Sequence, residues 1–148
     1  MHRNEHTVEI ARPPAAVFPY LTEPELLKRW VGGLTTFEAV EGESAAVGAQ
    51  SRQVMIVRGK EWKLDGELTA LEPDRFVQAR MEGKGLTVTT SYALEPIESG
   101  TRLTATVESD FSLLVARLFG GVVSREAQRK LRADLARLEA LVESETAS

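Results

Sequence analysis

The sequence predicts an α+β domain in which a curved, seven-stranded antiparallel sheet grips one long C-terminal helix. Three observations lead to this prediction. A short alternating segment opens the chain and runs into two short proline-started helices, a long tract of alternating segments with tight turns follows, and an amphipathic helical segment closes the sequence. A sheet that curves around a helix encloses space between the two layers, so this order of elements also predicts an interior pocket.

The opening segment combines a strand with a helix that proline interrupts. Residues 7–11 alternate polar and apolar side chains, which is typical of a half-buried strand. Pro13 and Pro14 end this strand, and proline is well placed in the first turn of a helix, where its missing N–H is not needed. We therefore expect a short helix over Pro14–Leu21 that Pro19 kinks or cuts.

A second short helix is expected directly afterwards. Thr22 stands three residues before Glu25, the spacing of a capping box in which each side chain bonds an orphan N–H of the helix start. The helix continues through Trp30, and Gly32 with Gly33 supplies the positive-φ residue that commonly ends a helix.

Six further strands are expected between Leu34 and Phe111, where short alternating runs are separated by Gly, Pro and Asp. The clearest run is 61–70, in which Trp62, Leu64, Gly66 and Leu68 share one face. The expected strands are Thr36–Glu41, Ala49–Val57, Glu61–Ala70, Phe76–Glu82, Leu86–Leu94 and Arg102–Glu108.

Beyond Phe111 the apolar period lengthens to that of a helix. Its apolar stripe consists of Leu131, Leu135, Leu138 and Val142. A helix from Leu113 to Glu143 would be longer than a small sheet needs, and Gly120 with Gly121 weakens it by about 1 kcal/mol per glycine relative to alanine. We therefore expect a kink there, or a start later than Leu113.

Length and composition favour one soluble domain, residues 1–148, with frayed ends at 1–5 and 144–148. The content of 43% hydrophobic and 27% charged residues is near the globular average, and no apolar run approaches the roughly 20 residues of a membrane span. Residues 1–7 contain no secretory signal, so we expect a cytoplasmic protein.

Charge and residue types limit the partners. A net charge of −4 disfavours nucleic acid, because phosphate binding depends on Lys and Arg. With no cysteine, the chain has no disulfide, thiol nucleophile or thiolate metal site. His2 and His6 are the only imidazoles and are a poor metal signal by themselves. We expect no metal and no cofactor, and a monomer or homodimer.

Three segments carry a family resemblance that covers essentially the whole chain: Val8–Gly33, Gly66–Phe76 and Leu118–Leu141. In these the sequence resembles the START-like, helix-grip superfamily (SRPBCC), which includes polyketide cyclases, lipid-transfer domains and plant pollen allergens. The resemblance implies a seven-stranded sheet wrapped around the C-terminal helix, with a cavity that accepts an apolar small molecule. It implies no catalytic residue, because the superfamily has no universal one.

Small residues on the inward rows support such a cavity. Gly66, Ala70, Ala79 and Ala105 leave volume that a ligand could occupy, although they could instead make room for bulky neighbours such as Trp62, Met81, Tyr92 and Phe119. The candidate ligand-binding residues are Trp30, Val54, Trp62, Leu64, Gly66, Leu68, Met81, Val88, Tyr92, Leu103, Val107, Phe119 and Val123.

Few polar residues are candidates for a chemical role. The Tyr92 hydroxyl could orient a ligand carbonyl or hydroxyl, or bond to a neighbouring strand. Arg52 and Arg80 could bind a carboxylate if their strands point them inward, and the sequence leaves that orientation open. Asp65 and Glu67 share the outward face of their strand, which favours a solvated pair.

Two classes of function follow. The first is a module that binds or transports a hydrophobic small molecule, such as a lipid, polyketide or isoprenoid, without chemistry of its own. The second is a polyketide cyclase or dehydratase that uses the same cavity, with Tyr92 moving a proton. The absence of His and Cys from the inward rows favours the first. A co-chaperone-like activator role is also known in the superfamily, and no residue selects it.

Overall fold

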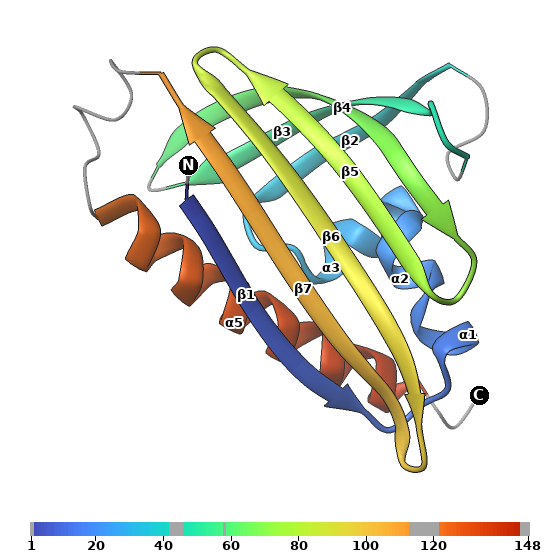
Figure 1. Ribbon diagram of the computed structural model, residues 1–148. Coiled ribbons are helices and arrows are strands. Elements are labelled where there is room, and N and C mark those ends of the chain that lie inside the picture. Colours follow the sequence, from blue (N-terminus) through green and yellow to red (C-terminus); the bar gives the residue numbers. More distant parts are fainter. Residues whose placement is uncertain (1, 42–45, 58, 113–121, 146–148) are drawn as a thin grey trace.

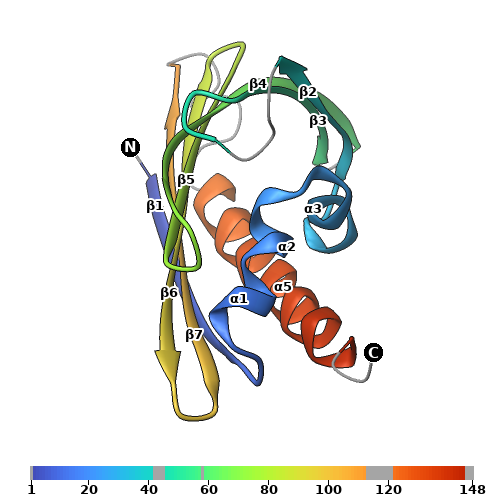
Figure 2. The same ribbon diagram turned by 90° about the vertical axis from the view of Figure 1, so that its right-hand side faces the viewer.

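The computed structural model describes residues 2–41, 46–57, 59–112 and 122–145. The strands form one antiparallel sheet of seven strands in the order β1-β7-β6-β5-β4-β3-β2, and the sheet curls over the helices (Figures 1 and 2). The strands are β1 (His2–Ile10), β2 (Leu34–Glu41), β3 (Gln50–Val57), β4 (Lys60–Glu72), β5 (Phe76–Gly83), β6 (Leu86–Ile97) and β7 (Gly100–Phe111). The helices are α1 (Pro14–Val17), α2 (Pro19–Thr22), α3 (Pro24–Trp30) and α5 (Val122–Ser144). The expected fold class is confirmed.

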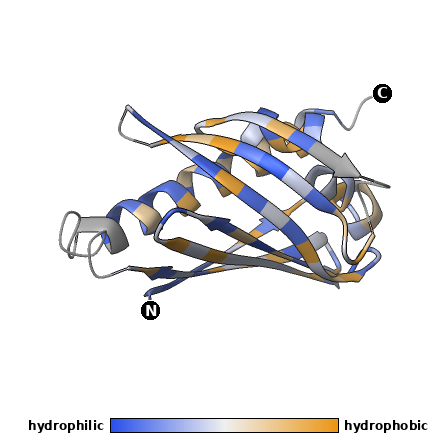
Figure 3. Cartoon of the chain, turned by 90° about the horizontal axis from the view of Figure 1, so that it is seen from above, coloured by the Kyte–Doolittle hydropathy of each residue, from blue (hydrophilic) through white to orange (hydrophobic). Residues whose placement is uncertain are grey.

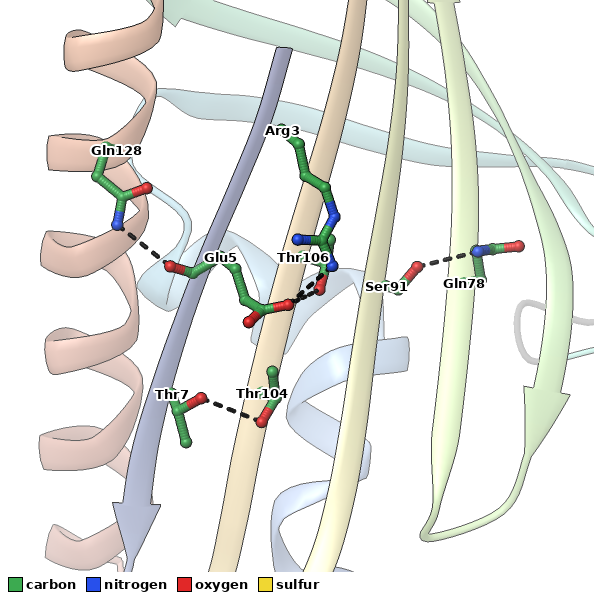
Figure 4. Close-up of polar contacts among 8 residues, drawn as sticks. All are labelled: Arg3, Glu5, Thr7, Gln78, Ser91, Thr104, Thr106 and Gln128. Atoms are coloured by element: carbon green, nitrogen blue, oxygen red, sulfur yellow. Dashed lines mark hydrogen bonds and ion pairs between the residues drawn. The ribbon is translucent and has the colours of Figure 1, made fainter. Parts of the chain in front are cut away.

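Strand β1 begins at His2, within residues 1–5, the segment that the sequence analysis expects to be frayed. It pairs with β7 along its whole length, from His2 opposite Ser109 to Ile10 opposite Thr101. On the outer face, Glu5 accepts hydrogen bonds from Arg3 at 2.9 Å and from Thr106 at 3.3 Å (Figure 4). The sequence analysis predicts only the second part of this strand, since residues 2–6 are all polar and show no alternation of polar and apolar side chains.

Proline sets the boundaries of the short helices. Pro19 cuts the first expected helix into α1 and α2. The expected capping box at Thr22 is wrong, since the N-cap is Glu23, no side chain caps the helix, and Thr22 is buried. The ring of Pro24 disfavours helical geometry in the residue before it, which holds Glu23 extended at φ −85° and ψ 125° and makes it the residue before the helix.

Helix α5 lies across the concave side of the sheet and packs against β1 and α3 (Figure 2). Its expected apolar stripe is confirmed: Leu131 is 7% exposed, and Leu135, Leu138 and Val142 are fully buried. The expected weak point at Gly120 and Gly121 lies outside the described residues. Within the expected frayed end, residues 144–148, Glu145 accepts a hydrogen bond from Tyr20 and lies 2.7 Å from Arg29.

Hydrophobic and hydrophilic residues alternate along the strands (Figure 3). On the inward face, the apolar side chains form one cluster, to which β1, the short helices, β6, β7 and the second half of α5 contribute. This core includes Ile10, Val17, Leu21, Leu94, Leu103, Ala105, Leu135, Leu138 and Val142. None of the described helices is long and apolar enough to cross a lipid bilayer.

Candidate ligand-binding cavity

A cavity of about 780 Å³ lies between the concave face of the sheet, the end of α3 and the first half of α5. This volume is within the range of small-molecule binding sites, which is roughly 300–1,000 Å³. Apolar side chains make up most of its wall. They include Leu27, Trp30, Phe37, Met55, Trp62, Leu64, Leu68, Val77, Met81, Leu86, Val88, Val107, Phe111 and Leu131.

Strand alternation places most of the expected residues on this wall. Successive side chains of a strand point to opposite faces, so every second residue of β4, β5 and β6 faces inward. Eight of the candidate residues line the cavity: Trp30, Trp62, Leu64, Leu68, Met81, Val88, Tyr92 and Val107.

Three other candidates lie elsewhere. Leu103 is fully buried in the core and does not reach the cavity. Val54 lies on the outer face of β3, since its neighbours Gln53 and Met55 line the cavity. Gly66 faces inward, but a Cβ there would lie only 2.7 Å from the Ser51 hydroxyl and 2.9 Å from the Gln53 amide nitrogen, so these two side chains occupy the volume that we expected to be open. Phe119 and the side chain of Val123 lie outside the described residues.

The phases of β3 and β5 determine the orientations of Arg52 and Arg80. Arg52 follows the outward phase of Val54 and is exposed. Arg80 is exposed on β5 and pairs with Glu82 at 2.5 Å. Both face away from the cavity, so neither supplies a handle for a carboxylate there.

Tyr92 is the central polar residue of the sheet wall. Its ring packs edge-on against Trp30, with 5.9 Å between ring centroids, and Trp30 itself donates to the carbonyl of Tyr20 at 2.8 Å. Among the described residues, none is hydrogen-bonded to the Tyr92 hydroxyl. Burial, and then the negative charge of Asp134, raises the pKa of Tyr92, so the hydroxyl keeps its proton.

Asp134 is a buried site residue that the sequence analysis missed. Its side chain is only 8% exposed, and it accepts from the backbone N–H of Gly32 at 3.0 Å and from Arg137 at 3.1 Å, and also pairs with Lys130. Arg137 also donates to the carbonyl of Trp30 at 2.7 Å. All five residues line the cavity. This network joins α5 to the end of α3 at the wall of the cavity.

The chemical groups at the cavity wall limit what the site can bind. No group of three or more His, Asp or Glu among them is placed to hold a metal ion. The polar side chains at the wall are hydroxyl and amide groups, the paired charges around Asp134, and the charged residues Lys60, Glu67 and Glu126. Such a site can surround an apolar molecule and hydrogen-bond to a few of its atoms.

Comparisons with known proteins agree with this geometry. A family model described as "Polyketide cyclase / dehydrase and lipid transport" matches residues 1–143. No curated protein matches the chain in sequence.

Solved structures share the fold at low sequence identity. TTHA0849 from Thermus thermophilus has a TM-score of 0.79 at 21% identity, covering 99% of both chains. CV1439 from Chromobacterium violaceum has a TM-score of 0.74 at 18% identity, and Ara h 8.0201 has 0.74 at 19%; each alignment covers 97% of this chain and 99% of the other. With its whole-chain family match and this fold, the protein belongs to the polyketide cyclase/dehydrase and lipid transport family of the START-like helix-grip superfamily.

Proposed function

We propose that this protein binds and carries a hydrophobic small molecule, such as a lipid, polyketide or isoprenoid, inside the cavity between the sheet and α5. The observation that supports the proposal is the apolar wall around a volume of about 780 Å³. Transfer of apolar surface out of water contributes about 2.5 kcal/mol per 100 Å², so a molecule of this size has a sufficient driving force for binding.

The ligand would contact the side chains that line the cavity from both layers. From the sheet these are Trp62, Leu64, Leu68, Met81, Val88, Tyr92 and Val107, and from the helical layer Trp30. The aromatic rings offer large contact surfaces, and Trp30 is rigid because both its indole N–H and its ring are engaged.

Solvent extraction and native mass spectrometry of the purified protein test the proposal. We expect an apolar molecule to be released from the wild-type protein. Ala79→Trp would fill the cavity, because Ala79 lines it, whereas Ala93→Trp on the exposed face of β6 is the matched control. The first variant should lose the bound molecule and the second should keep it. If the wild-type protein neither contains nor takes up any apolar compound, the proposal is wrong.

An enzyme of the cyclase or dehydratase kind is the second candidate, and one observation favours it. The Tyr92 hydroxyl faces the cavity with its proton retained, as a proton donor to a reacting carbonyl would require. A Tyr92→Phe variant that turned over a candidate polyketide as fast as the wild type would exclude this proton-transfer role.

A further inference from the structure

Three polar side chains line the part of the cavity wall formed by β6 and β7, and a fourth lies beside them on β1. Thr90 and Tyr92 are two residues apart on β6, and both line the cavity. Ser109 on β7 also lines it, and it lies diagonally across from Thr90, because Thr90 pairs with Val107 and Ser109 with Val88. Asn4 on β1 pairs with Val107, which places it diagonally beside Ser109. Such neighbours lie about 7–8 Å apart or less, so the four side chains form one polar strip.

These side chains lack hydrogen-bond partners in the part of the chain that the structure describes. Asn4 is 5% exposed, and its amide nitrogen has no partner. Ser109 is 7% exposed, and neither its hydroxyl nor those of Thr90 and Tyr92 bonds to another described residue. Among the described residues, the Asn4 amide nitrogen is the one fully buried side-chain atom without a partner, and leaving such a group unpaired is costly. Thr90, Tyr92 and Ser109 line the cavity, where a ligand can reach their hydroxyls. Leucine and valine occupy the other inward positions of β6 at 86, 88 and 94, so the strip interrupts an apolar row.

The strip lies at one end of the cavity, and its own side chains are uncharged. Tyr92 pairs with Ala105, which belongs to the filled core, so the strip lies at the core end of the cavity. It contains amide and hydroxyl groups only. Asp134, the charged residue that acts electrostatically on the Tyr92 hydroxyl, is a carboxylate, so the strip itself offers a ligand anion no cationic partner. Lys130 and Arg137, the cations beside Asp134, are paired with it.

We propose that the cavity selects an apolar molecule with a neutral hydroxyl or carbonyl group, which enters first and hydrogen-bonds to the strip of Asn4, Thr90, Tyr92 and Ser109. This inference builds on the proposed function and narrows the ligand class to neutral oxygenated molecules, in preference to hydrocarbons and carboxylates. The hydroxyl groups can donate or accept, whereas the Asn4 amide nitrogen supplies a fixed donor.

Three fluorescent probes of nearly equal size test the proposal: 9-methylanthracene, 9-anthracenemethanol and 9-anthracenecarboxylate. Their affinities are measured by fluorescence titration of the wild type and of the Thr90→Val, Ser109→Ala and Tyr92→Phe variants. Thr89→Val is the matched control, because Thr89 is the next residue of β6 and points to the opposite face.

We expect the wild type to bind the alcohol more tightly than the carboxylate. The ratio of alcohol to hydrocarbon affinity should fall about fivefold for each hydrogen bond removed in the strip variants, and stay unchanged in Thr89→Val. Binding of the hydrocarbon serves as the internal check that each variant is folded.

Two failures can be told apart. If all three probes bind but the ratio is the same in the wild type and in every strip variant, or if the carboxylate binds most tightly, the selection of a neutral oxygen is wrong and hydrophobic binding stands. If the folded wild type binds no probe, the proposed function fails together with this inference.

Discussion

Replacing Asp134 should destabilise the junction between α3 and α5. In an Asp134→Ala variant the N–H of Gly32 loses its acceptor, and Lys130 and Arg137 lose the carboxylate that they share. An unsatisfied buried donor costs about 1–3 kcal/mol. Breaking a fully buried ion pair would cost more, but the side chains of Lys130 and Arg137 are 33% and 48% exposed, so water can solvate both after the change.

The expected loss is therefore about 2–3 kcal/mol for Asp134→Ala, or roughly 5–10 °C in Tm for a domain of this size. Asp134→Asn keeps an acceptor oxygen for Gly32 and should lose only about 1 kcal/mol. Arg132→Gln, at an exposed position of the same helix, is the control and should stay within about 0.5 kcal/mol of the wild type.

Urea denaturation followed by circular dichroism measures all three variants, because a shift in midpoint at constant slope reports a change in stability. The reasoning would be refuted if Asp134→Ala were as stable as Arg132→Gln. It would also be refuted if Asn and Ala at position 134 were equally destabilising, since then the bond to Gly32 would contribute nothing.

Other predictions concern the core, the turns and pH. Leu135→Ala, at a fully buried position, should cost about 3–5 kcal/mol in the same urea assay. Gly33→Ala should unfold the protein or cost several kcal/mol, because φ is +83° and the new Cβ would lie 2.3 Å from a backbone oxygen of β3. Gly48→Ala also has a positive φ, +93°, but its Cβ would meet no atom, so it should cost only about 1 kcal/mol. Comparing the Tm values of the two variants checks this. The hydrogen bond from Tyr20 lowers the pKa of Glu145 below 4.5, so its stabilisation is present above that pH and lost as the pH falls through the lowered value. Tm measured from about pH 6 to 3 should therefore fall less steeply in Tyr20→Phe, and an unchanged slope would contradict this assignment.

Helices and strands that are buried on one face and solvent-exposed on the other could be predicted from the sequence. Leu131, Leu135, Leu138 and Val142 recur at helical spacing, and the structure buries all four. Strand β4 alternates in the same clear way, so Trp62, Leu64 and Leu68 were assigned to the correct face. Burial on one side leaves a periodic signal, and that signal is local in the sequence.

Strand β3 shows why other residues could not be assigned. It places Val54 outward and Gln53 inward, against the usual preference, so hydropathy does not fix its phase. Asp134 falls on the apolar stripe of α5 at helical spacing from Leu131 and Leu138, which was an available warning. Its partner Gly32 is 102 residues away, however, and the hydrogen bond uses the backbone N–H, which every residue except proline has, so the sequence does not identify the donor.

The polar strip in the cavity is a product of strand register. Asn4, Thr90 and Ser109 come from three strands, and each looks like an ordinary polar residue in its own segment. Only the pairing of β1 with β7 and of β7 with β6 brings them together. A single sequence contains the alternation of each strand but not the alignment between strands.

The pairing of the first strand with the last has a consequence for synthesis on the ribosome. Strands β2 to β7 follow one another as hairpins, but β1 must wait for β7, and His2 meets its partner Ser109 only after more than a hundred further residues have been translated. Helix α5, which closes the apolar interior, is made later still. The growing chain therefore exposes the apolar concave face of the sheet through most of translation, a stage at which chaperones protect nascent proteins from aggregation.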